Sequence, residues 1–242
     1  MRVPRIYQQG TLEVDKTYEL STSASHHLYK VLRLAVNHPI ILFNGDGQNY
    51  LAEITSLGKT VFAIVKAIEK NHVESPVNIH LGQVISKGDK MEYTVQKAVE
   101  LGANAITPLF SSRCNIKLNP ERQLKKQTQW QMIIENACQQ SGRSSVPNCH
   151  TPTNLLNWIV NIDCQLKIIL DPTGSVQLKR LPQQNILSIA LLVGSEGGFS
   201  QEEVNCAKTH GFTAVNLGHR ILRTETASVA MLAILQAWYG DL

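Results

Sequence analysis

The sequence predicts an α/β protein in which a small N-terminal β-barrel precedes a larger domain built on a mainly parallel sheet. Three features predict this fold class. Residues 1–70 contain mainly strand patterns, residues 71–76 form a polar stretch that ends in proline, and strand patterns alternate with helix patterns from residue 77 onward. We therefore expect two domains, residues 1–72 and residues 73–242.

The expected barrel takes its strands from segments rich in apolar and β-branched residues, separated by turns that contain glycine. These segments are Val3–Tyr7, Pro39–Asn44, Asn49–Ser56 and Val61–Ile68. A helix is expected after the first strand, at Ser23–Leu34, where apolar and basic residues are interleaved. A small barrel with one helix is the simplest assembly of these elements.

In the larger domain, short apolar runs alternate with amphipathic segments, as in a parallel sheet covered by helices. The expected strands are Val77–Ile85, Ala105–Phe110, Gln165–Leu170, Ile189–Val193 and Phe212–Leu217. The expected helices are Lys87–Leu101, Pro120–Ser141, Asn154–Val160, one that follows Ser200, and Ala227–Trp238. Ser86 and Gly102 are interpreted as the start and stop signals of the first of these helices. The last helix is apolar on nearly every face and must be buried, in a core or against another chain.

The composition sets limits on the kind of protein. At 242 residues, with 43% hydrophobic and 17% charged residues, the chain is long enough for one large domain or two modest ones, and its composition does not favour disorder. The net charge of +4 and the pI near 8.8 permit a nucleic-acid partner without requiring one.

The cysteines, apolar segments and histidines bear on the cellular compartment, membrane attachment and metal binding, respectively. The five cysteines are scattered and contain no Cys-x-x-Cys pair, which predicts a reduced, cytoplasmic protein. No segment has a signal-peptide pattern or approaches the ~18 apolar residues of a membrane-spanning helix, so we expect no membrane partner. The histidines show no metal-ligand spacing, so we expect no metal site.

A glycine-rich turn follows the strand at Ile189–Val193. The turn contains Gly194, Gly197 and Gly198, and a capping box formed by Ser200 and Glu203 starts the next helix. The glycines alone fit either a tight connection or a ligand-binding turn. For a ligand, the carboxylate of Glu196 would repel a polyphosphate, whereas a molecule with ribose hydroxyls and positive charge, such as S-adenosylmethionine, fits.

A second polar loop, residues 217–227, carries arginines, threonines and a glutamate between a strand and the apolar last helix. Charged loops on a rigid scaffold are where binding and catalysis concentrate. A third turn begins at Asp171, at the carboxyl end of another strand. Asp171 is interpreted either as a residue that faces the ligand or as the turn-forming Asp before Pro172.

The two loops carry a resemblance to a known family. Gly194-Ser-Glu-Gly-Gly-Phe-Ser200, followed by Leu217-Gly-His-Arg-Ile-Leu-Arg-Thr-Glu-Thr-Ala227, resembles the paired cofactor loops of SPOUT methyltransferases. Among these the chain is similar to the RsmE family, which methylates N3 of a uridine in 16S ribosomal RNA. The similarity extends over nearly the whole chain and includes Met1–Tyr7, Leu81–Glu92, Gln96–Gly102 and Asn136–Arg143. Ser195 and His219 depart from it, because the family usually has Pro at both positions.

The resemblance implies an S-adenosylmethionine-dependent rRNA (uridine-N3) methyltransferase. It implies a homodimer, a deep trefoil knot in the C-terminal SPOUT domain and an N-terminal PUA-like barrel that grips RNA. The cofactor-binding residues it implies are Leu170, Asp171, Val193, Gly194, Ser195, Glu196, Gly197, Gly198, Leu217, Gly218, Ile221, Leu222, Thr224, Thr226 and Ala227.

Catalysis is expected to depend on charged residues of the same loops. Arg223 would stabilise the uridine anion, and either Glu196 or Glu225 would take the N3 proton. Basic residues elsewhere are interpreted as a solvated surface on their number alone, and as RNA-binding residues in view of the resemblance. The RNA-binding residues so expected are Arg2, Arg5, Lys30, Arg33, Arg113, Lys117, Arg122 and Arg143.

Two other functions remain open from the sequence. A non-catalytic RNA-binding factor for ribosome assembly would share the basic residues, and it is favoured if Ser195 and His219 abolish cofactor binding. A SPOUT enzyme that methylates a ribose 2′-oxygen would share the cofactor loops. A dehydrogenase is not favoured, because the glycine turn lacks the Gly-x-Gly-x-x-Gly spacing.

Overall fold

The computed structural model describes residues 3–114, 116, 118–174, 176–182 and 185–242. The chain forms two compact units. The first contains the chain up to Glu74 together with Cys138–Val146, and the second contains Ser75–Ala137 and Pro147–Leu242. The return of Cys138–Val146 to the first unit was not apparent in the sequence, because tertiary hydrogen bonds rather than a local pattern place it there.

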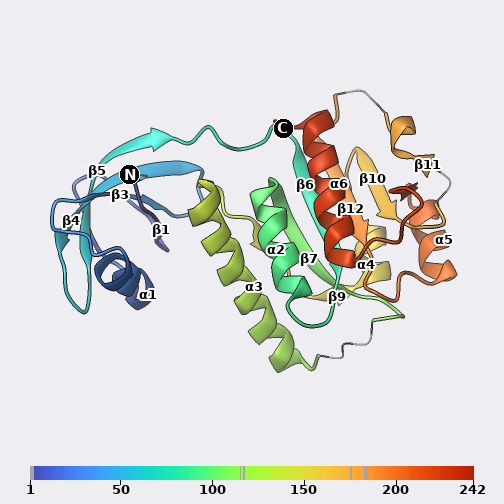
Figure 1. Ribbon diagram of the computed structural model, residues 1–242, viewed down its shortest axis with the longest axis horizontal. Coiled ribbons are helices and arrows are strands. Elements are labelled where there is room, and N and C mark those ends of the chain that lie inside the picture. The colour runs from blue at the N-terminus through green and yellow to red at the C-terminus, as the bar shows by residue number, and fades with distance from the viewer. Residues whose placement is uncertain (1–2, 115, 117, 175, 183–184) are drawn as a thin grey trace. The chain divides into compact units, whose positions relative to one another are not determined.

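The first unit is a curled, mainly antiparallel sheet (Figure 1). In sheet order its strands are β1 (Arg5–Tyr7), β3 (Pro39–Phe43), β4 (Gln48–Ser56), β5 (Phe62–Lys70) and β2 (Thr17–Glu19). β1 runs parallel to β3, and the other pairs are antiparallel. The short strand β2 was not predicted. Inward side chains that alternate along β3, β4 and β5, such as Leu42, Ile54 and Val65, form the core with Leu28.

One helical segment crosses this sheet, and it is shorter than the predicted Ser23–Leu34. Helix α1 (Thr22–His26) is capped by Ser21 and continues into the π-helical turn η1 (His27–Val31). Arg33 has a φ of 52°, in the left-handed region, so the helix cannot continue to Leu34.

The second unit contains the predicted parallel sheet, and every strand pair in its described part is parallel. In sheet order the strands are β11 (Val176–Gln177), β13 (Thr213–Asn216), β10 (Leu166–Leu170), β12 (Ser188–Val193), β6 (Asn78–Val84), β7 (Ala103–Phe110) and β8 (Asn148–Cys149), and β9 (Thr153–Asn154) also pairs with β7. The two-residue strands β8, β9 and β11 were not predicted, because so short a strand leaves no pattern in the sequence.

Helices cover the sheet of the second unit. Figure 1 shows α2 (Lys90–Glu100) and α6 (Thr224–Tyr239) side by side in front of the sheet. Helices α4 (Leu155–Asn161) and α5 (Gln201–Thr209) pack together, and Trp158 and Val204 from them form a core with Ala190 and Leu192 of β12. The remaining helices are α3 (Pro120–Ser141), at its predicted limits, and the short 3₁₀ helix η2 (Leu178–Arg180).

Two predicted helix starts were wrong. α2 begins at Lys90 rather than Lys87, with Asp89 at its N-cap position, because Gly88 has a φ of 63°. Ser86 is therefore no helix cap. α6 begins at Thr224 rather than Ala227, so part of the expected loop forms its first turn. The side chains that α6 buries include Met231, Leu232 and Leu235, which lie on one face.

Candidate functional site

A cavity of about 340 Å³ lies at the carboxyl ends of three adjacent parallel strands, β12, β10 and β13. The register aligns Ile169 with Leu192 and Leu170 with Val215, so the turns that leave these strands meet at one edge of the sheet. The start of α6 closes the cavity. Its lining consists of Leu170, Asp171, Pro172, Val193, Gly194, Ser195, Glu196, Gly198, Phe199, Val215, Asn216, Leu217, Gly218, Arg220, Ile221, Leu222, Arg223, Thr224 and Ala227.

The cavity brings together thirteen of the residues expected to bind a cofactor. They are Leu170, Asp171, Val193, Gly194, Ser195, Glu196, Gly198, Leu217, Gly218, Ile221, Leu222, Thr224 and Ala227. Gly197 and Thr226 do not line it. A Cβ on Gly197 would lie 3.1 Å from the carbonyl oxygen of Arg113, so this glycine faces the Arg113 loop, and Thr226 is exposed on α6.

The turn at Gly194–Gly198 is closed by its own backbone. The N–H of Gly198 donates to the carbonyl oxygen of Ser195 over 2.9 Å, and Gly198 has a φ of 64°. The Oγ of Ser195 is buried and has no hydrogen-bond partner within the described chain. A buried hydroxyl without a partner in the lining of a cavity is suited to a polar ligand group.

Asn216 was missed by the sequence analysis and orders two of the cavity turns. Its Nδ2 donates to the carbonyl oxygen of Pro172 over 2.7 Å, and its Oδ1 accepts from the N–H of Gly218 over 2.7 Å. Asn216 therefore joins the turn after β10 to the turn after β13. The available signal was an Asn at a strand end directly before a Leu-Gly turn.

A buried glutamine joins β6 to the first turn of α6. Gln83 is completely buried, and its Nε2 donates to Thr224 Oγ1 over 3.0 Å. Ser228 Oγ donates to Gln83 Oε1 over 2.7 Å. Gln83 was not predicted as a site residue, although a Gln inside an otherwise apolar strand was the available signal.

The three expected catalytic residues differ in position. Arg223 is exposed and extended, directly before α6, and it lines the cavity. Glu196 also lines the cavity, and its Oε1 accepts from Lys90 Nζ over 2.6 Å. Glu225 does not line it, and its Oε2 is buried with no partner within the described residues.

The environment of Glu196 makes it a weak base. Partial burial acts to raise the pKa of the Glu196 carboxyl, but hydrogen bonds and charge attraction from Lys90, together with backbone N–H groups, lower it overall. Glu196 is therefore ionised at neutral pH and holds a proton poorly.

The expected RNA-binding residues separate into groups. Arg2 and Lys117 lie outside the described residues. Lys30, Arg33, Arg113 and Arg122 are exposed. Tyr29, which was not predicted from the sequence, is 41% exposed, and Lys30 Nζ lies 5.0 Å from its ring centre. An exposed aromatic ring next to cations suits unpaired nucleotides, because bases stack on the ring and phosphates bind the cations.

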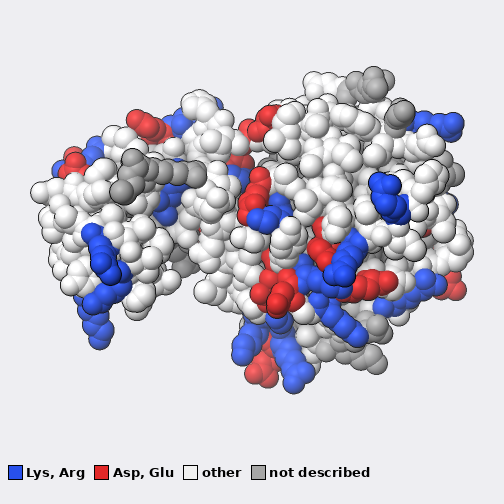
Figure 2. Space-filling model, viewed as in Figure 1, with Lys and Arg blue, Asp and Glu red and all other residues white. Residues whose placement is uncertain are grey.

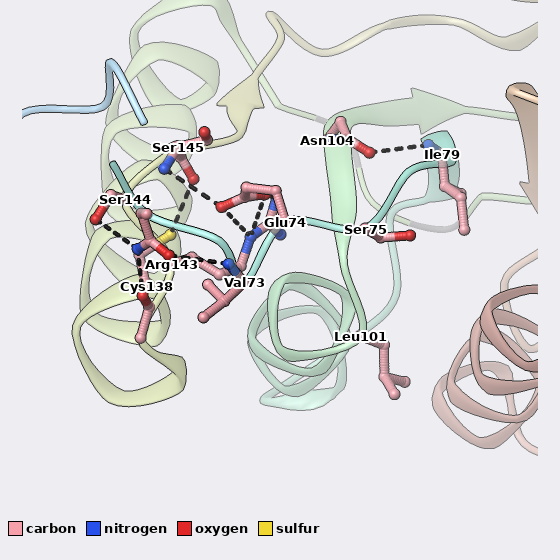
Figure 3. Close-up of polar contacts among 12 residues, drawn as sticks. Val73, Glu74, Ser75, Ile79, Leu101, Asn104, Cys138, Arg143, Ser144 and Ser145 are labelled. Atoms are coloured by element: carbon pink, nitrogen blue, oxygen red, sulfur yellow. Dashed lines mark hydrogen bonds and ion pairs between the residues drawn. The ribbon is translucent and has the colours of Figure 1, made fainter. Parts of the chain in front are cut away.

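Arg5 and Arg143 have structural contacts instead. Arg143 is 4% exposed, and its guanidinium contacts the Glu74 carboxylate, with Nη2 2.7 Å from Oε2 (Figure 3). The Arg5 guanidinium binds Asn49 Oδ1 and Ser144 Oγ. Arg143 therefore does not present its charge to solvent, and its expected role in RNA binding does not fit the structure.

The basic start of α3 is partly neutralised by tertiary contacts. Lys126 Nζ lies 3.6 Å from Glu92 Oε1 of α2, an acid that is distant in the sequence. Figure 2 shows red and blue side chains intermingled over this end of α3. This region is therefore less positive than its sequence alone indicates.

The described residues show neither a metal-ligand cluster nor a membrane-spanning helix. No group of three or more His, Cys, Asp or Glu side chains within the described chain is arranged to hold a metal ion. The helices of the described part are too short or too polar to span a bilayer.

Comparisons with known proteins support the family resemblance. The model of the RNA methyltransferase domain matches residues 73–236, and that of the RNA methyltransferase PUA domain matches residues 20–66. Ribosomal RNA small subunit methyltransferase E of Buchnera aphidicola (subsp. Schizaphis graminum) is 39% identical, over 100% of this chain and 98% of that protein. The protein of the same name from Bacillus subtilis is 29% identical, over 93% of this chain and 91% of its own length.

Two solved structures are similar over their whole lengths. A methyltransferase from Legionella pneumophila, in complex with the bound cofactor SAM, has 42% identity and a TM-score of 0.95, with 100% of both chains covered. Ribosomal RNA small subunit methyltransferase E from Neisseria gonorrhoeae, bound to S-adenosyl methionine, has 37% identity and a TM-score of 0.91, again with 100% of both chains covered. The chain thus belongs to the RNA methyltransferase family, together with the ribosomal RNA small subunit methyltransferase E proteins.

Proposed function

We propose that this protein transfers a methyl group from S-adenosylmethionine to N3 of a uridine in 16S ribosomal RNA. The observation that carries the proposal is the cavity at the ends of β10, β12 and β13, which gathers the glycine turn, Arg223 and the start of α6. The relatives solved with this cofactor have the same fold over their whole chains, which supports the choice of cofactor.

The cavity fits S-adenosylmethionine in size and chemistry. Its volume of about 340 Å³ is in the range of small-molecule sites. Apolar side chains such as Leu170 and Leu222 would enclose the adenine, and the Ser195 hydroxyl and Glu196 carboxylate offer polar contacts to the ribose and the ammonium group. The bound cofactor would supply the electrophilic methyl group.

The departures at Ser195 and His219 are compatible with cofactor binding. The carbonyl oxygen of Ser195 already accepts the hydrogen bond that closes the glycine turn, so the turn forms without a proline. His219 is exposed and is not part of the cavity lining. These observations favour an enzyme over a non-catalytic assembly factor.

Arg223 would assist the reaction electrostatically. Uridine N3 has a pKa roughly two units above neutral, so the site must favour its deprotonation by about 3 kcal/mol. A guanidinium at the cavity lining stabilises the negative charge that develops on the base. Of the two candidate bases, Glu196 is paired with Lys90, which favours Glu225. Because Glu225 does not line the cavity, the N3 proton of the uridine would reach its carboxylate through a water molecule.

The two expected domains would have different functions, RNA binding in one and methyl transfer in the other. The N-terminal domain, residues 1–72, would grip RNA through Lys30, Arg33 and the exposed ring of Tyr29, while residues 73–242 would bind the cofactor and react. N3 lies on the Watson–Crick edge, so the target uridine must be unpaired or flipped out before it reacts.

A cytoplasmic homodimer with a trefoil knot completes the proposal. Ile221, in the loop before α6, and Trp238, in the last turn of α6, are 89% and 46% exposed in the single chain. Large apolar side chains left in solvent are suited to a surface for a partner chain. A second copy of this chain is the proposed partner. Sedimentation equilibrium, which gives the mass of the particle in solution, would distinguish a dimer from a monomer.

The direct test is methyl transfer from labelled S-adenosylmethionine to small ribosomal subunits that lack the modification, followed by nuclease digestion and mass spectrometry of the nucleosides. Label in 3-methyluridine supports the proposal. Label in a 2′-O-methylated nucleoside would show the ribose-directed alternative. No transfer, together with no cofactor binding by calorimetry, would favour the assembly factor.

A further inference from the structure

The two oxygens of the Glu203 carboxylate accept hydrogen bonds from two different segments of the chain. Glu203 is 4% exposed on the first turn of α5. Its Oε2 accepts from the N–H of Ser200 over 2.8 Å, and Ser200 Oγ accepts from the N–H of Glu203 over 3.2 Å. These two bonds form the predicted capping box. They leave the other carboxylate oxygen, Oε1, for a different partner.

That partner is a loop distant in the sequence. Glu203 Oε1 accepts from the backbone N–H of Ser112 over 2.7 Å. A charged acceptor makes a stronger bond than a neutral one, and burial strengthens it further. The segment Ser111–Cys114 is therefore held at the start of α5, directly after the glycine turn.

The same segment touches the glycine turn through Arg113. Arg113 Nη1 donates to the carbonyl oxygen of Gly197 over 3.3 Å. The approach is close, because a Cβ on Gly197 would lie 3.1 Å from the Arg113 carbonyl oxygen and 3.2 Å from its Cβ. Arg113 is exposed, and a guanidinium has five N–H donors, so it keeps donors for another partner beside the cavity.

We propose that Glu203 is a positioning residue for the RNA substrate: it holds the Ser111–Cys114 segment so that Arg113 binds an RNA phosphate beside the glycine turn. Glu203 itself touches neither the cofactor nor the RNA. The inference rests on the proposed function, because it assumes that RNA approaches the cavity. It goes further in assigning to the capping residue a task that a cap alone does not perform.

The chain offers a matched control for the capping function. S200A removes the Ser200 hydroxyl and weakens the cap, but it keeps the bond between Glu203 Oε1 and Ser112. E203Q keeps the volume, but it replaces one carboxylate oxygen by an N–H donor, so the cap and the Ser112 bond cannot both persist. If Glu203 only caps α5, the two variants should behave alike.

The experiment measures kcat and KM for undermethylated small subunits, together with cofactor Kd and thermal stability, in the wild type, S200A, E203Q and R113A. We expect E203Q and R113A to raise KM for the subunit and to lower kcat/KM by roughly 10- to 100-fold, since small misplacements near a reacting group have effects of this size. S200A should lower thermal stability about as much as E203Q and leave KM unchanged. The cofactor Kd of E203Q should change no more than that of S200A.

A double variant tests the link between the two residues. If Glu203 acts through Arg113, the loss in kcat/KM of E203Q/R113A should not exceed that of R113A alone. Additive losses, or equal KM values for S200A and E203Q, would overturn the inference. A wild-type protein without any methyl transfer would instead contradict the proposed function, so the two failures are distinguishable.

Discussion

Thr224 Oγ1 donates a hydrogen bond to the carbonyl oxygen of Gly194, and this contact joins the first turn of α6 to the glycine turn. The same Thr224 oxygen accepts from Gln83 Nε2, so a buried strand residue supports two walls of the cavity. A rigid cavity binds a ligand without first losing conformational entropy. The Gln83–Thr224–Gly194 contacts therefore connect the core of the sheet to cofactor affinity.

Replacement of Gln83 by Leu tests this connection. Q83L would remove one hydrogen-bond partner from each of the buried hydroxyls of Thr224 and Ser228, and we expect it to lower the free energy of unfolding by about 1–3 kcal/mol. We also expect cofactor affinity to fall about tenfold, as measured by calorimetry. S228A is the control, because it removes the contact farther from the cavity and should weaken cofactor binding less. Equal affinities for Q83L and the wild type would contradict the connection.

Arg223 should affect turnover more than cofactor binding. R223A removes the guanidinium proposed to stabilise the uridine anion, and loss of such a group lowers kcat by about 10²–10³-fold. Single-turnover rates and calorimetric Kd values, measured on the same preparations, separate the two effects. R223K, which keeps the charge, should retain part of the rate. A parallel loss of rate and cofactor affinity would show that Arg223 only binds the cofactor.

The contribution of Glu196 to the free energy of unfolding should decrease in acid. Its folded pKa is lowered below the ordinary 4.5, so its pairing with Lys90 stabilises the fold above pH 4.5 and is lost as the pH falls through the folded pKa. Because both side chains are about one-third exposed, at 33% and 39%, the contribution at pH 7 should be only about 0.5 kcal/mol.

E196Q tests both the pairing and the catalytic role of this residue. Urea denaturation at pH 7 should show the small loss of stability, and the difference from the wild type should shrink as the pH falls below 4.5 and through the lowered folded pKa. If Glu196 is not the base, the rise of the methylation rate with pH should have the same midpoint in E196Q as in the wild type. A shifted midpoint would make Glu196 the proton acceptor.

The sequence predicted the parts of the fold that depend on local patterns. The longer strands of the parallel sheet, the full length of α3 and the capping box at Ser200 are confirmed, because apolar periodicity and capping residues lie close together in the chain. The start of α2 was wrong, since the left-handed conformation of Gly88 is not visible in composition. The trefoil knot remains a prediction of the family resemblance.

The site was predictable where the residues adjoin a recognisable turn. The glycine turn and residues 217–227 could be identified from the sequence, whereas Gln83 and Asn216 contribute through contacts between distant segments. Arg143 was expected to bind RNA for its charge and in view of the family resemblance. Its burial against Glu74 shows why a count of basic residues cannot separate a surface charge from a structural ion pair.

The pair of Arg143 and Glu74 should be important for the stability of the first unit. Arg143 is 4% exposed, and loss of one partner of a buried pair leaves the other charge without compensation, at a cost of about 3 kcal/mol. We therefore expect R143M to lower the free energy of unfolding by about that amount. The double variant R143M/E74L removes both charges and should recover part of the loss. A stability of R143M equal to that of the wild type would contradict the structural assignment.

His80 should make the protein less stable in mild acid. Burial, together with the neighbouring His150, lowers the pKa of His80 from 6.5 to about 4, and its Nε2 lies 2.7 Å from Thr107 Oγ1. Below pH 6.5 the unfolded chain gains a proton that the folded chain does not, so this contribution to stability falls as the pH decreases and levels off below pH 4. The total loss should be about 3 kcal/mol, of which about 2 kcal/mol is present at pH 5. In H80Q the side chain can still bond to Thr107 but cannot titrate. Urea denaturation at pH 7 and pH 5 should therefore show a smaller decrease for H80Q than for the wild type, and equal decreases would show that His80 is not the titrating group.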